Sequence, residues 1–145
     1  MPTYTRLGII RLLDVIPKIH ANWSAPNAKT MIGEHLVGVN SLRMKTFGRD
    51  ARASCGIACK ACGLEAEYFA IETFARGIVR QPHVNLYGLK DGEEVLFTHD
   101  HILARALGGK DILSNTQTMC SPCNSKKSKV EQKEVERRRA LTDSA

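Results

Sequence analysis

The 145-residue sequence has no apolar run that reaches the ~18–20 residues of a membrane-spanning helix. The apolar stretch near its start is interrupted by Arg11 and Asp14, which argues against a secretory signal. Internal repeats and long low-complexity linkers are also missing. These absences favour a globular, cytoplasmic protein without a membrane partner.

Positive charge is concentrated at the two ends of the chain. The sequence has 21 Lys and Arg against 15 Asp and Glu, a net charge of +6 and a pI near 9.2. Residues 1–50 carry seven basic side chains against three acidic ones, and residues 120–145 carry seven against four, whereas residues 51–119 are nearly balanced. DNA fits this distribution, because each neutralised phosphate releases counterions. A solvated basic surface fits equally well, so charge alone leaves the partner open.

The N-terminal part of the chain gives mixed secondary-structure signals. Residues 5–16 place most of their apolar side chains near one helical face, which predicts a helix that ends before Pro17. A second helix could open at Pro26 and run past Leu36, although two glycines weaken it. Residues 41–47 alternate apolar and basic side chains, which indicates a short strand.

The rest of the chain reads as strands followed by one helix. The predicted strands are 66–75, 83–89, 94–98 and 116–119. A turn is expected at Lys90-Asp91-Gly92. From Pro122 onward the residues are good helix formers without a wide apolar stripe, which indicates a largely solvated helix.

Two Cys-x-x-Cys pairs predict a metal site. The pairs are Cys59 with Cys62 and Cys120 with Cys123, and at this spacing a cytoplasmic chain favours metal over disulfides. Four thiolates at about 2.3 Å close a tetrahedral Zn²⁺ site with no open position for substrate, so the site should be structural. It would tie two remote segments together. The remaining cysteine, Cys55, is expected to be buried among apolar side chains.

The segment after residue 97 combines residue types that few structural needs require together. Asp100 and His101 end a predicted strand, Gly108-Gly109 breaks the loop that follows, and Asn115 precedes a short strand. Asn124 directly follows the second cysteine pair at the start of the helix. Strand, loop, strand and helix in this order predict a ββα unit, in which His101, Asp100 and Asn124 would meet in one small pocket.

These residues resemble the HNH endonucleases, the ββα-metal or His-Me finger nuclease superfamily. The positions that carry the resemblance are Asp100-His101-Ile102, Gly108-Gly109, Asn115, Cys120-x-x-Cys123-Asn124 and Lys127, preceded by Cys59-x-x-Cys62-Gly63. The last motif position, often histidine in that family, is Asn124 here, which makes the chain an H-N-N variant. An amide ligand should lower metal affinity and favour a hard ion.

The resemblance implies an α+β fold with a ββα-metal core and a role for each motif residue. His101 would be the general base, since imidazole ordinarily titrates near pH ~6.5 and can take a proton from water. Asp100 and Asn124 would hold one Mg²⁺ or Mn²⁺ ion, and Asn115 would orient the loop that carries His101. The expected reaction is phosphodiester hydrolysis that leaves a 5′-phosphate and a 3′-hydroxyl.

Basic side chains near the motif are candidate phosphate contacts. They are Arg105, Lys126, Lys127 and Lys129. The run from Arg137 to Arg139 could follow the DNA backbone or could simply be a solvated helix end. His99 is more often a neighbour on the opposite face of its strand than a ligand. The other histidines, His20, His35 and His83, have no partner at metal spacing, and no signal of sequence-specific base readout is visible.

The expected organisation is a helical N-terminal extension (1–54), a zinc-stabilised nuclease domain (55–130) and a basic helix end (131–145). Monomer and homodimer both stay open. The main alternative function is a zinc-stabilised DNA-binding module that does not cleave; a thiol redox protein would leave the second cysteine pair and His101 unexplained. By analogy with small free-standing nucleases, a phage or mobile-element origin is expected.

Overall fold

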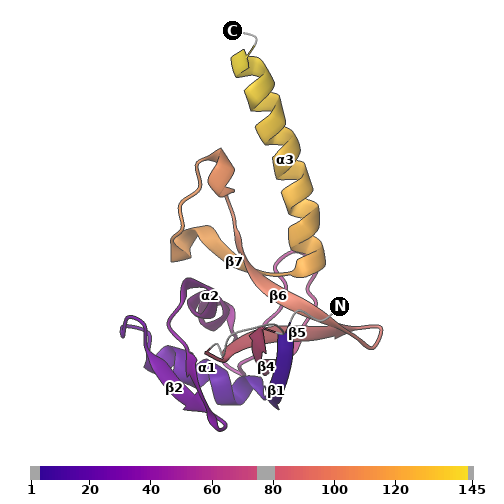
Figure 1. Cartoon of the computed structure of the whole chain (residues 1–145). Helices are drawn as coiled ribbons and strands as arrows, with labels where there is room; N and C mark the ends of the chain where they lie inside the picture. The colour runs from indigo at the N-terminus through magenta and orange to yellow at the C-terminus, as the bar shows by residue number, and fades with distance from the viewer. Residues whose placement is uncertain (1–3, 75–80, 144–145) are drawn as a thin grey trace.

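The structure is a computed structural model that describes residues 4–74 and 81–143 (Figure 1). The strands are β1 (Tyr4–Ile10), β2 (Lys29–Ile32), β3 (His35–Gly38), β4 (Ala66–Phe74), β5 (His83–Lys90), β6 (Glu93–His101) and β7 (Thr116–Cys120). The helices are α1 (Leu12–Ala21), α2 (Leu42–Asp50) and α3 (Ser121–Asp143), with the 3-10 helices η1 (Arg105–Leu107) and η2 (Leu113–Asn115). An antiparallel sheet with separate helices is an α+β fold, as predicted.

The strand β6 connects the main sheet to the region that carries the motif. Within the described residues, one antiparallel sheet has the strand order β1-β4-β5-β6-β7, and β2 and β3 form a separate hairpin. Residues 93–96 of β6 pair with β5, whereas residues 97–101 pair with β7. The second half of β6 therefore leaves the main sheet and, with β7, extends beneath α3 (Figure 1).

The helices α1 and α2 and the hairpin β2–β3 share one hydrophobic core with the main sheet. Its largest fully buried side chains include Phe47 of α2, Phe69 of β4 and Phe97 of β6. Fully burying one such side chain stabilises a fold by roughly 1.5–3 kcal/mol. Cys59 and Cys120 belong to the same core. The predicted nuclease segment is thus packed on the N-terminal part of the chain.

The helix predicted over residues 5–16 is wrong. Residues 4–10 form β1, which pairs with β4 from Tyr4 opposite Phe74 to Ile10 opposite Phe69. The helix α1 begins only at Leu12 and continues through Pro17 to Ala21. Pairing with a strand some sixty residues away overrides the local pattern. Buried side chains on both sides of Pro17 hold the helix together despite the lost backbone N–H.

The other two N-terminal predictions are also wrong. The helix expected from Pro26 past Leu36 is the hairpin β2–β3, which turns at Gly33 with φ 60°. The strand expected at residues 41–47 is α2, and the Ser41 side chain caps it by accepting a hydrogen bond from the Met44 N–H at 3.2 Å. The N-cap serine was the available signal for this helix.

The predictions for the central and C-terminal parts are confirmed. The strands β4 to β7 lie where they were expected, apart from residue 75, which is outside the described residues. The turn between β5 and β6 passes through Asp91 and Gly92, both with positive φ. Cys55 is buried in the core, as expected.

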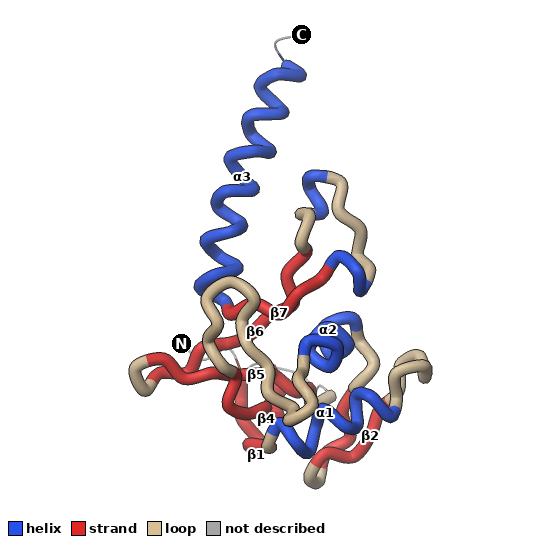
Figure 2. The backbone as a smooth tube through the Cα atoms, turned by 180° about the vertical axis from the view of Figure 1, so that it is seen from behind, coloured by secondary structure: helices blue, strands red, loops and turns tan. Residues whose placement is uncertain are grey.

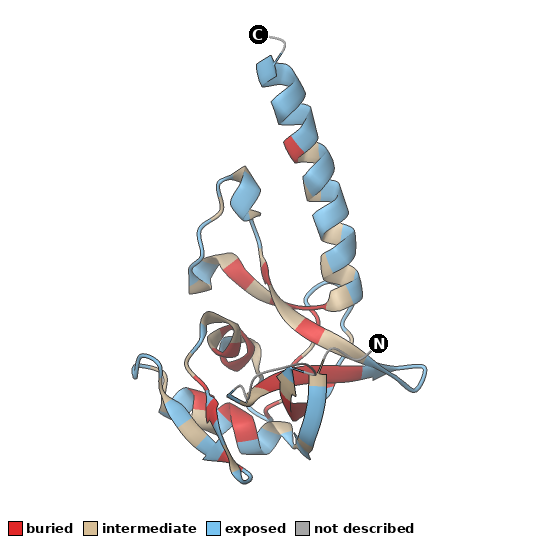
Figure 3. Ribbon diagram, in the orientation of Figure 1, coloured by how far each residue is buried: buried red, intermediate tan, exposed pale blue. Residues whose placement is uncertain are grey.

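The helix α3 extends well beyond the body of the molecule (Figure 3). Its surface is largely exposed and Val135 is its buried residue, as expected for a helix without an apolar stripe. Among the described residues, no helix is long and apolar enough to cross a membrane.

Candidate metal centre and active site

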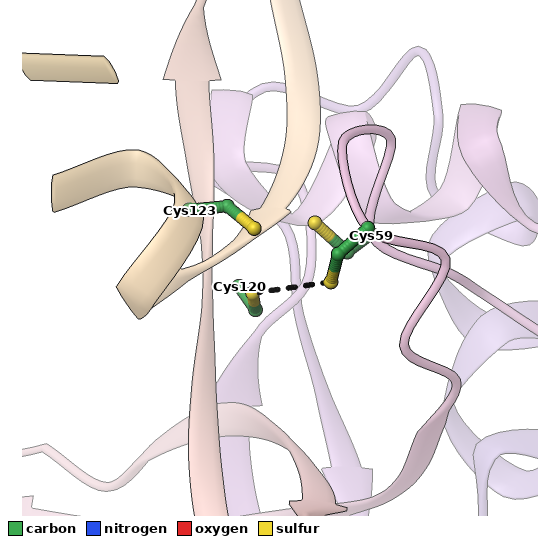
Figure 4. A group of neighbouring side chains, drawn as sticks. Cys59, Cys120 and Cys123 are labelled. Carbon is green, nitrogen blue, oxygen red and sulfur yellow. Dashed lines mark hydrogen bonds between the residues drawn. The ribbon is translucent and has the colours of Figure 1, made fainter. Parts of the chain in front are cut away.

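The two cysteine pairs meet at the start of α3. The ligand sulfurs of Cys59, Cys62, Cys120 and Cys123 all lie within 4.8 Å of one another, and the Sγ atoms of Cys62 and Cys120 are 3.8 Å apart (Figure 4). A tetrahedron with metal–sulfur bonds of about 2.3 Å separates its sulfurs by about 3.8 Å. The arrangement therefore matches a four-sulfur site, and thiolate ligands suit Zn²⁺ better than hard ions.

Backbone hydrogen bonds shape the loop that presents Cys59 and Cys62. The N–H of Gly63 donates to the Cys59 carbonyl at 2.9 Å, and Gly63 has the left-handed φ of 78° expected after the pair. The N–H of Lys60 donates to the Thr118 carbonyl of β7 at 3.0 Å. The loop between α2 and β4 is thereby fixed beside the start of α3 (Figure 2).

The thiols of the cluster have unequal proton affinities. Burial raises the pKa of Cys59, but the backbone N–H groups of Cys120, Cys62 and Ala61 outweigh it and lower the pKa to about 7. Burial, together with the neighbouring thiols, raises the pKa of Cys120 to about 12. A second thiolate beside the first is unfavourable unless a cation balances the charge. The cluster thus needs a metal ion to hold all four sulfurs ionised.

Asp100 is buried on the side of β6 that faces α3. Its exposure is 5%, and its carboxylate accepts hydrogen bonds from the Gln117 amide at 2.9 Å and from the Lys127 ammonium at 3.2 Å. Thr98, two residues earlier and on the same side, accepts a hydrogen bond from the Asn124 amide at 3.0 Å. The carboxylate of Asp100 and the amide of Asn124 therefore lie on one side of the strand.

Lys127 is part of this network and is not a free surface cation. Besides Asp100, its ammonium contacts the His101 carbonyl at 2.7 Å and the Glu131 carboxylate at 2.6 Å. Burial lowers the pKa of Lys127, but the hydrogen bonds to Glu131 and Asp100 outweigh it and raise the pKa above its usual range. A positive charge thus already sits against the buried carboxylate.

The same side of the molecule carries a basic pocket. Its volume is about 340 Å³, and Lys60, Lys126 and Lys127 line it together with Gln117 and Cys123. Lys60 was not among the predicted phosphate contacts, because it lies in the loop of the first cysteine pair, far from the motif in sequence. The two other predicted contacts, Arg105 of η1 and Lys129 of α3, are exposed.

His101 directs its ring to the other side of β6. Its Nε2 lies 2.7 Å from the Oδ1 of Asp111, and its ring centroid is 5.8 Å from that of His99. The hydrogen bond to His101 is the main cause that lowers the pKa of Asp111, so this carboxylate is ionised and can only accept. Nε2 therefore carries a proton, and in the neutral imidazole this leaves the lone pair of Nδ1 free.

Asn115 closes the loop between β6 and β7. Its side chain accepts from the Leu103 N–H at 3.0 Å and donates to the carbonyls of Leu103 at 3.0 Å and Lys110 at 2.8 Å. Its own carbonyl accepts from the Ile102 N–H at 2.8 Å. A Cβ atom at Gly109 would lie 1.7 Å from the Leu103 carbonyl oxygen, so only glycine allows this closure.

The structure therefore divides the predicted catalytic set between two sides of one strand end. Asp100 and Asn124 lie toward α3, whereas the ring of His101 lies toward Asp111. Among the described residues, no hydrogen bond joins the His101 ring to either of them. Asp111 was not among the predicted residues; an acid shortly after Gly108-Gly109 was the available signal, but its contact with His101 depends on the loop closure.

Residues 87–138 match the family model described as HNH endonuclease. This segment, about a third of the chain, is therefore similar to the HNH endonucleases. The HNH segment contains β6, the loop closed by Asn115, β7, most of α3 and the second cysteine pair. Cys59 and Cys62 lie outside it, so half of the sulfur cluster comes from another part of the chain. No curated protein and no solved structure matches the sequence.

Proposed function

We propose that the chain is a metal-dependent DNA endonuclease with His101 as its general base. The observation that carries this proposal is the contact between His101 and Asp111, which leaves Nδ1 free to accept a proton at a strand end whose preceding residue is a buried carboxylate. The match of residues 87–138 to the HNH endonuclease model supports a nuclease-type activity. The segment β6, β7 and α3 would be the ββα-metal unit.

The donor atoms near Asp100 fit a hard divalent ion. The carboxylate of Asp100 and the amide oxygen of Asn124 are oxygen ligands, and Mg²⁺ typically needs only one or two from the protein. The Lys127 ammonium shows that this place favours positive charge. A bound Mg²⁺ or Mn²⁺ would stabilise the charge that develops on the phosphate and the leaving oxygen.

In the proposed reaction, water attacks the scissile phosphorus while Nδ1 of His101 accepts a proton from it. The bond between phosphorus and the 3′ oxygen breaks, and that oxygen takes a proton from solvent. The products carry a 5′-phosphate and a 3′-hydroxyl. Asp111 keeps the proton on Nε2, and Asn115 holds the loop that presents the ring. The scissile phosphate would lie across the end of β6, within reach of both sides.

The sulfur cluster would have a structural task in this enzyme. A zinc ion held by Cys59, Cys62, Cys120 and Cys123 would fix the start of α3 and, with it, Asn124 and Lys127. The reduced cysteines suit a cytoplasmic location. Lys60, Lys126 and Lys129 would contact DNA phosphates, and Arg105 would do so from the loop.

One observation favours a second candidate, a DNA-binding module that does not cleave. Lys127 already neutralises Asp100, so the carboxylate could be a purely structural ion pair without any divalent ion. In that case the lysine-lined pocket would still bind DNA. The presence of a free base at His101 argues against this candidate, because a binding module gains nothing from it.

Plasmid cleavage separates the two candidates. Supercoiled DNA is incubated with the wild-type chain and with His101→Ala in Mg²⁺, Mn²⁺ or EDTA. The proposal expects nicking by the wild type that EDTA stops, and a loss of roughly 10²–10⁴-fold in the variant. The variant should retain its melting curve and DNA affinity. Unchanged nicking by His101→Ala would refute the mechanism, and DNA binding without any cleavage would favour the second candidate.

A further inference from the structure

A second pocket lies on the His101 side of β6. It has a volume of about 480 Å³ and is formed by the start of α2, β5 and β6. Its charged and titratable side chains are Arg43, His83, His99 and Asp111. Asp111 also contacts His101, so the pocket borders the proposed base. None of the roles proposed above uses Arg43 or His83.

Arg43 brings an unbalanced positive charge into this pocket. Its guanidinium donates to the Val84 carbonyl at 2.6 Å and weakly to the Asn85 side chain at 3.4 Å, and it lies 5.7 Å from the Phe47 ring centroid. Among the described residues, no carboxylate forms an ion pair with it. Burial lowers the pKa of Arg43, yet a guanidinium stays charged in proteins. A half-buried charge without a counter-ion is costly, which favours an anionic ligand.

The other charged groups around the pocket do not neutralise Arg43. Glu72 accepts hydrogen bonds from Arg6, Asn85 and Tyr87, and Asp111 is bound by His101. His83 and His99 add further donors that can turn toward an anion. Burial, and after it the nearby guanidinium, lowers the pKa of His83.

We infer that this pocket binds a backbone phosphate of the DNA strand that is cut, close to the scissile one, with Arg43 as its main contact and His83 as a second donor. The inference rests on the proposed function for the identity of the strand. Successive phosphates of one strand advance by about 3.4 Å along the duplex axis, so a neighbouring phosphate lies within reach of a pocket that borders His101. Such a contact would position the strand and carry no sequence information.

The test measures DNA affinity without cleavage. Binding of a fluorescent duplex oligonucleotide is followed by anisotropy at several salt concentrations, with every variant made in the His101→Ala chain. Arg43→Gln removes the charge of the guanidinium and retains a hydrogen-bond donor. His83→Gln removes the imidazole and likewise retains a donor. Lys90→Gln is the matched control, because Lys90 is exposed at the turn between β5 and β6, away from the pocket.

We expect Arg43→Gln to weaken binding about tenfold and to reduce the slope of log affinity against log salt by about 1. His83→Gln should weaken binding about two- to threefold and Lys90→Gln less than twofold. A folded Arg43→Gln chain with unchanged affinity and salt slope would overturn the inference. If the wild type does not cut DNA but Arg43→Gln still weakens DNA binding, the proposed nuclease activity is refuted. The phosphate site is then still supported.

A second measurement covers the case in which Arg43→Gln does not fold. Inorganic phosphate is added to the wild-type chain and backbone amide resonances are recorded. Shifts confined to residues 42–44 and to His83 support the site. Absence of shifts there, at phosphate concentrations that compete with DNA, would overturn it.

Discussion

The two ends of β7 are held in different ways. At Cys120 four sulfurs from two remote segments surround one point, and a Zn²⁺ ion held by all four would have no open position for substrate. At Thr116 the neighbouring loop is held by the side chain of Asn115 and by Arg49 of α2, which donates to the carbonyls of Leu113 and Thr116. The first end joins remote segments, whereas the second leaves the proposed base, His101, partly exposed.

Loss of one sulfur should have the largest effect. Structural zinc contributes about 10–16 kcal/mol in small domains, so Cys62→Ala should lose bound zinc and lower the melting temperature by roughly 10 °C or more. Elemental analysis and thermal unfolding measure both. Cys55→Ala is the control, since it removes a core sulfur outside the cluster and should retain one zinc per chain. Normal melting of Cys62→Ala would mean that no zinc stabilises this end.

Changes at the proposed metal ligands should alter the metal response and not the fold. Asp100→Asn and Asn124→Ala should each raise the Mg²⁺ concentration for half-maximal cleavage at least about tenfold, because the first removes the negative charge of a ligand and the second removes an oxygen ligand. A metal titration of plasmid nicking measures this. Asp50→Asn is the matched control for Asp100→Asn, since Asp50 is also a largely buried carboxylate in ion pairs. An unaltered metal response in both variants would reassign the ligands.

Opening the loop should slow the reaction with only a modest loss of stability. Asn115→Ala removes three hydrogen bonds to Leu103 and Lys110 and should lower kcat about 10–100-fold by releasing the strand end that carries His101. Asn40→Ala removes two comparable bonds, to the carbonyls of Asn22 and Trp23, far from the site. An equal loss of kcat in both variants would mean that Asn115 stabilises the fold in general and does not position His101.

The smallest effect is expected at Asp111. Asp111→Asn replaces the acceptor on Nε2 with an amide, which no longer fixes the tautomer that leaves Nδ1 free, and kcat should fall about tenfold with KM nearly constant. Single-turnover cleavage measures this against Asp91→Asn, an exposed turn carboxylate. A variant with wild-type kcat would show that Asp111 does not position the base.

Features that depend on short spacing could be read from the sequence. The cysteine pairs, the order of strands around Asp100-His101 and the helix after Pro122 were all predicted correctly, because each follows from neighbours along the chain. The N-terminal elements were not. β1 depends on pairing with β4, and residues 41–47 form a helix because Met44 and Phe47 pack together into the core.

The sequence by itself determined the similarity to HNH endonucleases and the two cysteine pairs, since residue type and spacing are sufficient to specify them. Only the tertiary structure decided their surroundings: Asp111 on His101, Lys127 on Asp100, and the unpaired charge of Arg43 beside the proposed base. These depend on which remote side chains are brought within hydrogen-bond distance. The packing of the whole core decides which side chains meet, and the local sequence pattern does not reveal it.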